Sequence, residues 1–185
     1  MKLKKFFFKS VNSTNDAAIR IIKNSNIKFG IIISDKQKKG KGQYGKKWIS
    51  LKGNLFVSIF FSLKKINIPL KEMTKINCYL IKKLISKYSK NKITIKAPND
   101  LLINKKKVCG ILQETLNKTN TQYLIIGIGI NLIKSPKIKN YPTTNMLEIT
   151  NNKIDNKYFA YKIKKIYEDF IPKLYKLDLK TINNI

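Results

Sequence analysis

The stretch that decides the fold runs from residue 92 to residue 132 and reads KITIKAPNDLLINKKKVCGILQETLNKTNTQYLIIGIGINL. It contains several apolar runs rich in β-branched residues, which predict strands at 92–96, 101–103, 107–115 and 122–132. Short polar segments at 104–106 and 117–120 join consecutive runs, as is typical of antiparallel hairpins. This part of the chain therefore predicts an antiparallel sheet.

The flanking sequence adds further strands and helices. Apolar runs predict strands at 5–11, 29–35 and 54–63. A helix is expected to begin at Ser13 or Thr14, because either side chain can cap it. Helical spacing of apolar residues predicts two more helices, at about 69–90 and 155–177. We therefore expect an α+β fold, with a mixed, largely antiparallel sheet and the helices packed on one side of it.

Length and composition indicate one globular domain. The chain has 185 residues, of which 43% are hydrophobic, enough to bury a substantial core. No apolar run is long enough to cross a membrane, so we expect no membrane partner. The first apolar run near the N-terminus has only three residues, which is too short for a signal peptide. A cytoplasmic location is therefore the default expectation.

The formal net charge of +29 first suggests a nucleic-acid partner. The lysines, however, are scattered through every segment, and Arg20 is the only arginine. Proteins that read DNA sequence favour arginine for its bidentate contacts to guanine. We therefore expect no nucleic-acid partner, although a basic nucleic-acid-binding protein is kept as an alternative.

The content of histidine and cysteine excludes several kinds of site. The chain has no histidine, and Cys78 and Cys109 lie far apart in apolar surroundings. Most zinc sites and any nucleophile activated by histidine are therefore ruled out. A disulfide is not expected in a reducing compartment.

The segment DKQKKGKGQYGKKW (35–48) carries glycines in the pattern G-x-G-x-x-G. Dinucleotide-binding loops and P-loops both place such glycines at the start of a helix that receives a phosphate. Here a Gly53-Asn54 turn follows too soon to leave room for that helix. The P-loop would also need a hydroxyl at Lys47. The loop therefore serves another ligand, or is simply a solvated basic loop.

Three other segments could hold a ligand. KAPND (96–100) is predicted to form a tight turn that holds a lysine and a carboxylate at a strand end. Gly110 follows Lys107 by three residues within a strand, where a glycine often marks the close approach of a ligand. GIGIN (127–131) omits two side chains from an apolar strand. Each segment also has a purely structural reading, as a stable turn or a packing site.

Five motifs occur together in a fixed order. They are STND at 13–16, Q-x-x-GKGQYGKKW at 37–48, K-x-PND at 96–100, K-x-x-GILQE at 107–114 and IGIGIN at 126–131. In this order they resemble the catalytic domain of biotin protein ligases (biotin–acetyl-CoA-carboxylase ligase), whose usual forms are STN, Q-x-x-GRGRRGR-x-W, KWPND, K-x-x-GILVE and GIGIN. The resemblance covers about residues 6 to 132, with the helix beyond.

This resemblance implies a fold, a reaction and partners. The fold would be that of biotin and lipoate ligases, which is similar to class II aminoacyl-tRNA synthetases. The family joins biotin to ATP as biotinyl-adenylate and then passes biotin to one lysine of a carrier domain. ATP, Mg²⁺ and biotin are the implied cofactors and substrates, and the biotin carboxyl carrier protein of acetyl-CoA carboxylase is the implied partner. A homodimer is left open.

The resemblance also implies roles for individual residues. A first group would bind biotin: Ser13, Thr14, Asn15, Gln37, Gly40, Lys41, Gly42, Gln43, Lys107 and Gly110. Trp48, Lys96 and Asn131 would contact ATP. Lys107, Lys96 and Asp100 would form the catalytic set, with Asp100 acting on magnesium or on the incoming lysine. The glycine loop would close over the adenylate as a lid, and no metal ligand is assigned.

The sequence departs from the family pattern at several positions. Lys41, Gln43 and Tyr44 replace arginines of the loop, so we expect weaker retention of the adenylate. Ala97 and Cys109 replace a tryptophan and an alanine, which we interpret as packing changes. We also expect residues 1–185 to form a single catalytic domain, without an N-terminal winged helix or a full C-terminal SH3-like barrel.

Two rival functions remain close to this one: that of another enzyme of the same superfamily, and that of a ligase that has lost its activity. A lipoate ligase or octanoyltransferase would share the fold, but its sequences lack this PND turn and this K-x-x-GIL strand. A degenerate ligase could bind biotin without turnover, because Gln43 replaces a loop arginine.

Overall fold

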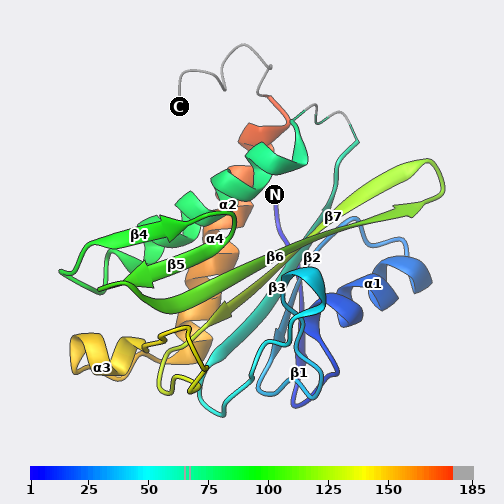
Figure 1. Cartoon of the computed structure of the whole chain (residues 1–185). Helices are drawn as coiled ribbons and strands as arrows, with labels where there is room; N and C mark the ends of the chain where they lie inside the picture. The colour runs from blue at the N-terminus through cyan, green and yellow to red at the C-terminus, as the bar shows by residue number, and fades with distance from the viewer. Residues whose placement is uncertain (65, 67, 177–185) are drawn as a thin grey trace.

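The computed structural model describes residues 1–64, 66 and 68–176. A seven-stranded sheet lies at the centre of this described part of the chain, in the order β1-β2-β3-β7-β6-β5-β4 (Figure 1). Its strands are β1 (Lys4–Phe8), β2 (Phe29–Ser34), β3 (Leu55–Ser62), β4 (Ile93–Lys96), β5 (Asp100–Ile103), β6 (Lys106–Lys118) and β7 (Thr121–Ile130). β1 and β2 are parallel, and all other neighbours are antiparallel. The predicted mixed, largely antiparallel sheet is confirmed.

The helices of the described residues are α1 (Thr14–Asn24), α2 (Leu70–Ile85), α3 (Met146–Thr150) and α4 (Asn156–Leu174). Ser13 caps α1, because its side chain accepts a hydrogen bond from the backbone N–H of Asn15. The short helix α3 was not predicted, and α2 ends five residues before the predicted boundary. Residue 177, at the end of the last predicted helix, lies outside the described residues.

The helices cover both faces of the sheet, so the expectation that they all pack on one side is wrong. Figure 1 shows α2 and α4 side by side on one face, with α1 apart from them on the other. Every residue of β3 is buried, with Ile59 facing the larger core and Phe60 facing α1. Because both faces of the central strands are apolar, both require cover. None of the helices in the described residues is long and apolar enough to cross a bilayer.

The two predicted hairpins between β5, β6 and β7 are confirmed. Their turn residues have positive φ angles, 50° and 62° at Asn104 and Lys105, and 41° and 54° at Thr119 and Asn120. Two consecutive residues of this kind are typical of the type I′ turn, whose twist matches that of paired strands. These turns fix the register of β6 and β7, which carry one wall of the site described next.

Candidate active site

A cavity of about 800 Å³ lies on the face of the sheet that carries α1. Its lining comes from the start of α1, the glycine loop, the turn between β4 and β5, strands β6 and β7, and the segment 138–141 after β7. It brings together most of the residues predicted for the site, namely Ser13, Thr14, Asn15, Gln37, Lys41, Gly42, Gln43, Trp48, Lys96, Asp100, Lys107 and Gly110. Segments almost a hundred residues apart in sequence therefore meet at one concave surface.

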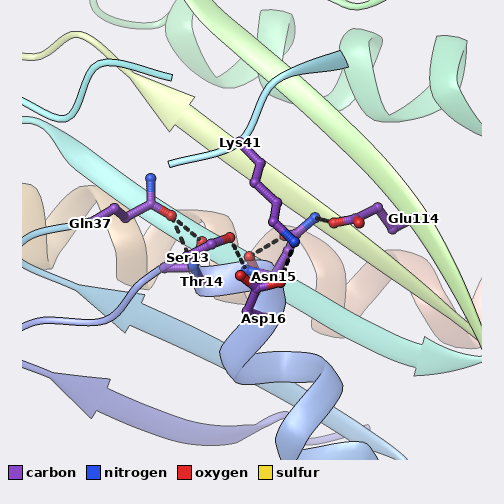
Figure 2. Close-up of polar contacts among 8 residues, drawn as sticks. Ser13, Thr14, Asn15, Asp16, Gln37, Lys41 and Glu114 are labelled. Atoms are coloured by element: carbon purple, nitrogen blue, oxygen red, sulfur yellow. Dashed lines mark hydrogen bonds and ion pairs between the residues drawn. The ribbon is translucent and has the colours of Figure 1, made fainter. Parts of the chain in front are cut away.

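Asn15 forms the buried polar end of the cavity (Figure 2). Its Oδ1 accepts a hydrogen bond from Ser58 Oγ at 2.5 Å, and its Nδ2 donates to Glu114 Oε2 at 2.6 Å. A Cβ atom at Gly127 would lie 2.5 Å from Asn15 Oδ1, so a side chain there would displace the amide. The first glycine of GIGIN thus makes room for the amide at the start of α1.

Gln37 ties the glycine loop to α1 (Figure 2). Its Oε1 accepts hydrogen bonds from the backbone N–H and the hydroxyl of Thr14, at 2.8 and 3.1 Å. Its Nε2 donates to Ser50 Oγ at 3.2 Å, beyond the glycines. Gln37 therefore has a structural task in addition to any contact with a ligand.

The glycine loop forms a small hairpin. Gly42 N–H donates to Lys46 O at 2.7 Å, and Trp48 N–H donates to Gly40 O at 2.9 Å. The tip is a single 3₁₀ turn at Gln43–Gly45, in which Tyr44 has a φ of 52° and is 90% exposed. No helix follows the glycines, as predicted, so this loop has the geometry of neither a P-loop nor a dinucleotide-binding turn.

Lys41 reaches from this hairpin to the first turn of α1 (Figure 2). Its Nζ lies 2.5 Å from Asp16 Oδ1, and both side chains are partly exposed. This hydrogen bond raises the pKa of the Lys41 ammonium, with a smaller opposing effect of burial. The loop cation is therefore held by a carboxylate at the edge of the cavity.

The Trp48 indole packs against two glycines. Gly110 of β6 and Gly129 of β7 are partners in the antiparallel register. A Cβ at Gly129 would lie 2.5 Å from Trp48 Cε2, and one at Gly110 would lie 2.7 Å from Trp48 Cζ3. The two glycines thus leave the space that the indole fills, which explains why the sequence omits side chains at both positions.

A charged cluster lies beside this indole. Lys107 Nζ is 2.7 Å from Asp100 Oδ1, with both side chains largely buried. The Tyr141 hydroxyl donates to Asp100 Oδ2 at 2.6 Å. Lys107 Nζ also lies 5.2 Å from the centroid of the Trp48 ring. Burial, followed by the hydrogen bond to Asp100, raises the pKa of the Tyr141 phenol well above its ordinary value.

Gly40 and Asn131 are not among the lining residues. A Cβ at Gly40 would lie 2.5 Å from Trp48 O, so this glycine permits the close approach of the hairpin strands. The buried Asn131 accepts a hydrogen bond from Asn54 Nδ2 at 3.4 Å and donates to Thr144 O at 3.1 Å. In this structure both residues therefore hold neighbouring segments together beside the cavity and do not line it.

Sequence reasoning did not single out Tyr141, which lines the cavity, or Ser58 and Glu114, which hydrogen-bond to Asn15 from outside the lining. Tyr141 follows β7 in a segment without periodicity, so nothing in the sequence singles it out. Ser58 is a polar residue in an otherwise apolar strand, a signal that could have been used. Glu114 belongs to the GILQE motif, but its contact with Asn15 depends on how β6 lies beside α1.

The site contains ammonium groups suited to binding anions. Among the residues that the structure describes, no group of three or more His, Cys, Asp or Glu side chains could hold a metal ion. Cys78 and Cys109 are free and buried. Burial raises the pKa of the Cys78 thiol to about 11 and also raises the pKa of the Cys109 thiol well above its ordinary value, so neither is an activated nucleophile.

Comparison with known proteins matches this chain to one family. The model of the "Biotin/lipoate A/B protein ligase family" matches residues 7–131. The bifunctional ligase/repressor BirA of Bacillus subtilis is 28% identical over 176 residues, covering 87% of this chain and 53% of the relative. BirA of Escherichia coli is 31% identical over 125 residues, covering 66% and 38%. The chain therefore spans about half, or less, of the length of these curated relatives.

Solved structures show the same fold. A biotin protein ligase from Aquifex aeolicus, in complex with biotin and ATP, has a TM-score of 0.78 and 28% identity, covering 94% of this chain and 72% of that one. The ligase from Leishmania major, in complex with biotinyl-5-AMP, has a TM-score of 0.82 and 21% identity, covering 98% and 78%. The second likeness supports the fold alone.

Proposed function

Because this chain belongs to the biotin/lipoate A/B protein ligase family, we propose that it is an ATP-dependent biotin–protein ligase. It would activate biotin as biotinyl-adenylate and then transfer it to a specific lysine of a carrier domain. The names of its relatives and the biotin and ATP in the Aquifex aeolicus complex support this activity. We further propose that residues 1–185 act as one catalytic domain.

The observation that carries the proposal is the composition of the cavity on the α1 face of the sheet. A buried polar end at Asn15 and a set of ammonium groups at Lys41, Lys96 and Lys107 line the same 800 Å³ space, with the Trp48 indole in its lining. A polar heterocycle with an acid tail, together with a nucleotide, needs these three features. The cavity is also large enough for a small ligand of this kind.

The ureido ring of biotin would lie at the start of α1. Ser13 Oγ accepts a hydrogen bond from Asn15 N–H, which leaves its own proton free to donate to the ureido oxygen. Gln37 Nε2 retains a second N–H after its bond to Ser50. Both polar atoms of the Asn15 side chain are already bonded within the protein, so we assign it the task of shaping this end.

The first chemical step needs no protein nucleophile. A carboxylate oxygen of biotin attacks the α-phosphorus of ATP, a P–O bond forms, and pyrophosphate leaves with the electrons of the broken P–O bond. Negative charge gathers on the α-phosphate oxygens, so fixed cations stabilise the transition state. Lys107 would bind the carboxylate and α-phosphate, while Lys96 binds the ATP phosphates. Trp48 would stack on the adenine.

The second step transfers the acyl group. The amine of the carrier lysine attacks the acyl carbon, AMP leaves with its phosphate, and an amide forms with loss of one proton. Asp100 lies near enough to the cavity to receive that proton or to orient the amine, although Lys107 and Tyr141 engage its oxygens. The hairpin at 40–48 would cover the adenylate and exclude water that would hydrolyse it.

The partners follow from this chemistry. We propose the biotin carboxyl carrier protein of acetyl-CoA carboxylase as the acceptor. Magnesium would arrive with the ATP phosphates, since Mg²⁺ is commonly bound through phosphates and water rather than by a protein cage. A cytoplasmic location would provide both ATP and the carrier.

The proposal is tested by incubating the purified chain with ATP, magnesium, labelled biotin and a biotin carrier domain. Label on the carrier lysine is expected. A carrier in which that lysine is replaced by arginine is the matched control and should remain unlabelled. Label that appears only as free adenylate would indicate a degenerate enzyme, and incorporation of lipoate instead of biotin would indicate the rival ligase.

A further inference from the structure

Tyr141 contacts the charged groups at one end of the cavity. Its hydroxyl donates to Asp100 Oδ2 at 2.6 Å. The ammonium of Lys96 lies 4.3 Å from the centroid of its ring, and that of Lys107 lies 5.5 Å from the same centroid. One side chain therefore touches all three residues of the proposed catalytic set.

The backbone next to Tyr141 is hydrogen-bonded to the backbone of Lys107. Lys107 N–H donates to Pro142 O, and Thr144 N–H donates to Lys107 O, both at 2.9 Å. The Asn131 amide adds a third bond, to Thr144 O at 3.1 Å. Because these bonds involve both polar backbone groups of Lys107, they fix where the segment after β7 lies relative to that lysine.

The two oxygens of the Asp100 carboxylate have different partners. One carboxylate oxygen faces Lys107 at 2.7 Å and the other accepts from Tyr141. Burial first, and then this hydrogen bond, raises the pKa of Tyr141, so the phenol remains a donor at neutral pH. Without the donor, the carboxylate could turn both oxygens toward the Lys107 ammonium and draw it away from a ligand.

We propose that Tyr141 is a positioning residue of the adenylation step. Its hydroxyl fixes the orientation of the Asp100–Lys107 pair, and its ring holds Lys96 at the cavity by a cation–π contact. This role rests on the proposed ligase function. It does not require Tyr141 to touch the reacting atoms.

Two substitutions separate the hydroxyl from the ring. Tyr141→Phe removes the donor and keeps the ring, whereas Tyr141→Leu removes both. Tyr79→Phe, at a half-exposed tyrosine of α2, is the matched control. The measurements are kcat for adenylate formation, the KM values for ATP and biotin, and the thermal midpoint.

We expect Tyr141→Phe to lower kcat about tenfold, as loss of a supporting contact to a reactive group commonly does, with the KM for biotin within about twofold. Tyr141→Leu should in addition raise the KM for ATP, because Lys96 loses its aromatic partner. Tyr79→Phe should behave as wild type. A Phe variant with wild-type kcat would overturn the role, as would a loss of kcat accompanied by an equal loss of biotin binding and of thermal stability.

A second measurement needs no substrate. Acetylation of lysines by acetic anhydride, read by peptide mass spectrometry, reports how available each amine is. In Tyr141→Phe we expect Lys107 to be acetylated more slowly than in wild type, relative to the exposed Lys83, because its ion pair with Asp100 tightens. An unchanged or faster rate would refute the role of the hydroxyl. The acetylation rate tests the role of the Tyr141 hydroxyl even if the wild type shows no biotin-dependent turnover. Absence of that turnover would instead refute the proposed ligase function.

Discussion

At the scale of single residues, the site depends as much on missing side chains as on those present. Gly110 and Gly129 face the Trp48 indole, and Gly127 faces the Asn15 amide. The sequence marked Gly110 as a place of close approach and GIGIN as a strand that omits two side chains, but it could not say what lies against these glycines. The partners come from the loop after β2 and from α1, so only the folded chain identifies them.

Replacing Gly129 by alanine should displace the Trp48 indole from the position that it occupies against β7. The added Cβ would meet Trp48 Cε2 at 2.5 Å, a separation that real Cβ atoms do not show. Loss of base stacking on an aromatic residue is worth about 1–3 kcal/mol, so the Kd for ATP should rise by roughly five- to 150-fold. Fluorescence titration of ATP would measure it, with Ile126→Val, in the core on the opposite face of β7, as the control. Equal ATP affinity in Gly129→Ala and wild type would contradict this use of the glycine.

Gln43 at the tip of the hairpin should set how long the adenylate is retained. It lines the cavity but has no charge where the resembling ligases carry an arginine. Gln43→Arg should therefore slow release of biotinyl-adenylate, by about tenfold for one charge-assisted hydrogen bond of roughly 1.5 kcal/mol. A filter assay without carrier measures the release rate, and Gln122→Arg, an exposed position of β7 outside the cavity lining, controls for added charge. Release from Gln43→Arg as fast as from wild type would contradict the expectation.

At the scale of elements, the hairpins were predictable and the arrangement of helices was not. Polar turns between apolar runs predicted the pairing of β5, β6 and β7, which the structure confirms. Helices can pack on both sides of the sheet because both of its faces are apolar. The runs of β2 and β3 are buried without alternation of polar and apolar residues, so their sequence does not show which face each helix covers. The short helix α3 escaped prediction because five residues provide too little periodicity.

The turn between β6 and β7 stores local strain. Thr119 is β-branched and has a φ of 41°, and Asn120 follows with a φ of 54°. β-Branched residues rarely adopt this region, whereas Asn-Gly is the preferred pair for a type I′ turn. Replacing Thr119 by Asn and Asn120 by Gly should raise the free energy of unfolding by about 1 kcal/mol. Urea denaturation measures it, and an unchanged midpoint would argue against strain at this turn.

At the scale of the whole molecule, the sheet separates the larger hydrophobic core from the site. The larger core lies between the sheet and the helices α2 and α4, while the cavity opens on the face of α1. Both cysteines belong to the core side. The motif order indicated which segments form the site, and the cavity brings most of them together, while the binding roles of their residues stay predictions. It could not predict that Gly40 and Asn131 lie behind the lining, because the sequence does not indicate which residues of a motif face outward.

The buried thiols should make the fold sensitive to alkaline pH. Burial raises the pKa of Cys78 from 9.0 to about 11, so the folded state keeps a proton that the unfolded chain loses. The free energy of unfolding should therefore be unaffected by this group below about pH 9 and fall as the pH rises towards about 11. Chemical denaturation at several pH values, with Cys78→Ala compared with wild type, measures it. An equal pH dependence in both proteins would contradict this assignment.

The most direct test of the proposed chemistry is biotin-dependent exchange of labelled pyrophosphate into ATP, because it reports formation of the acyl-adenylate without any carrier. We predict exchange that requires biotin, and that falls by at least about a hundredfold when Lys107 is replaced by methionine. Absence of exchange with biotin at saturating ATP and magnesium would contradict the proposed function.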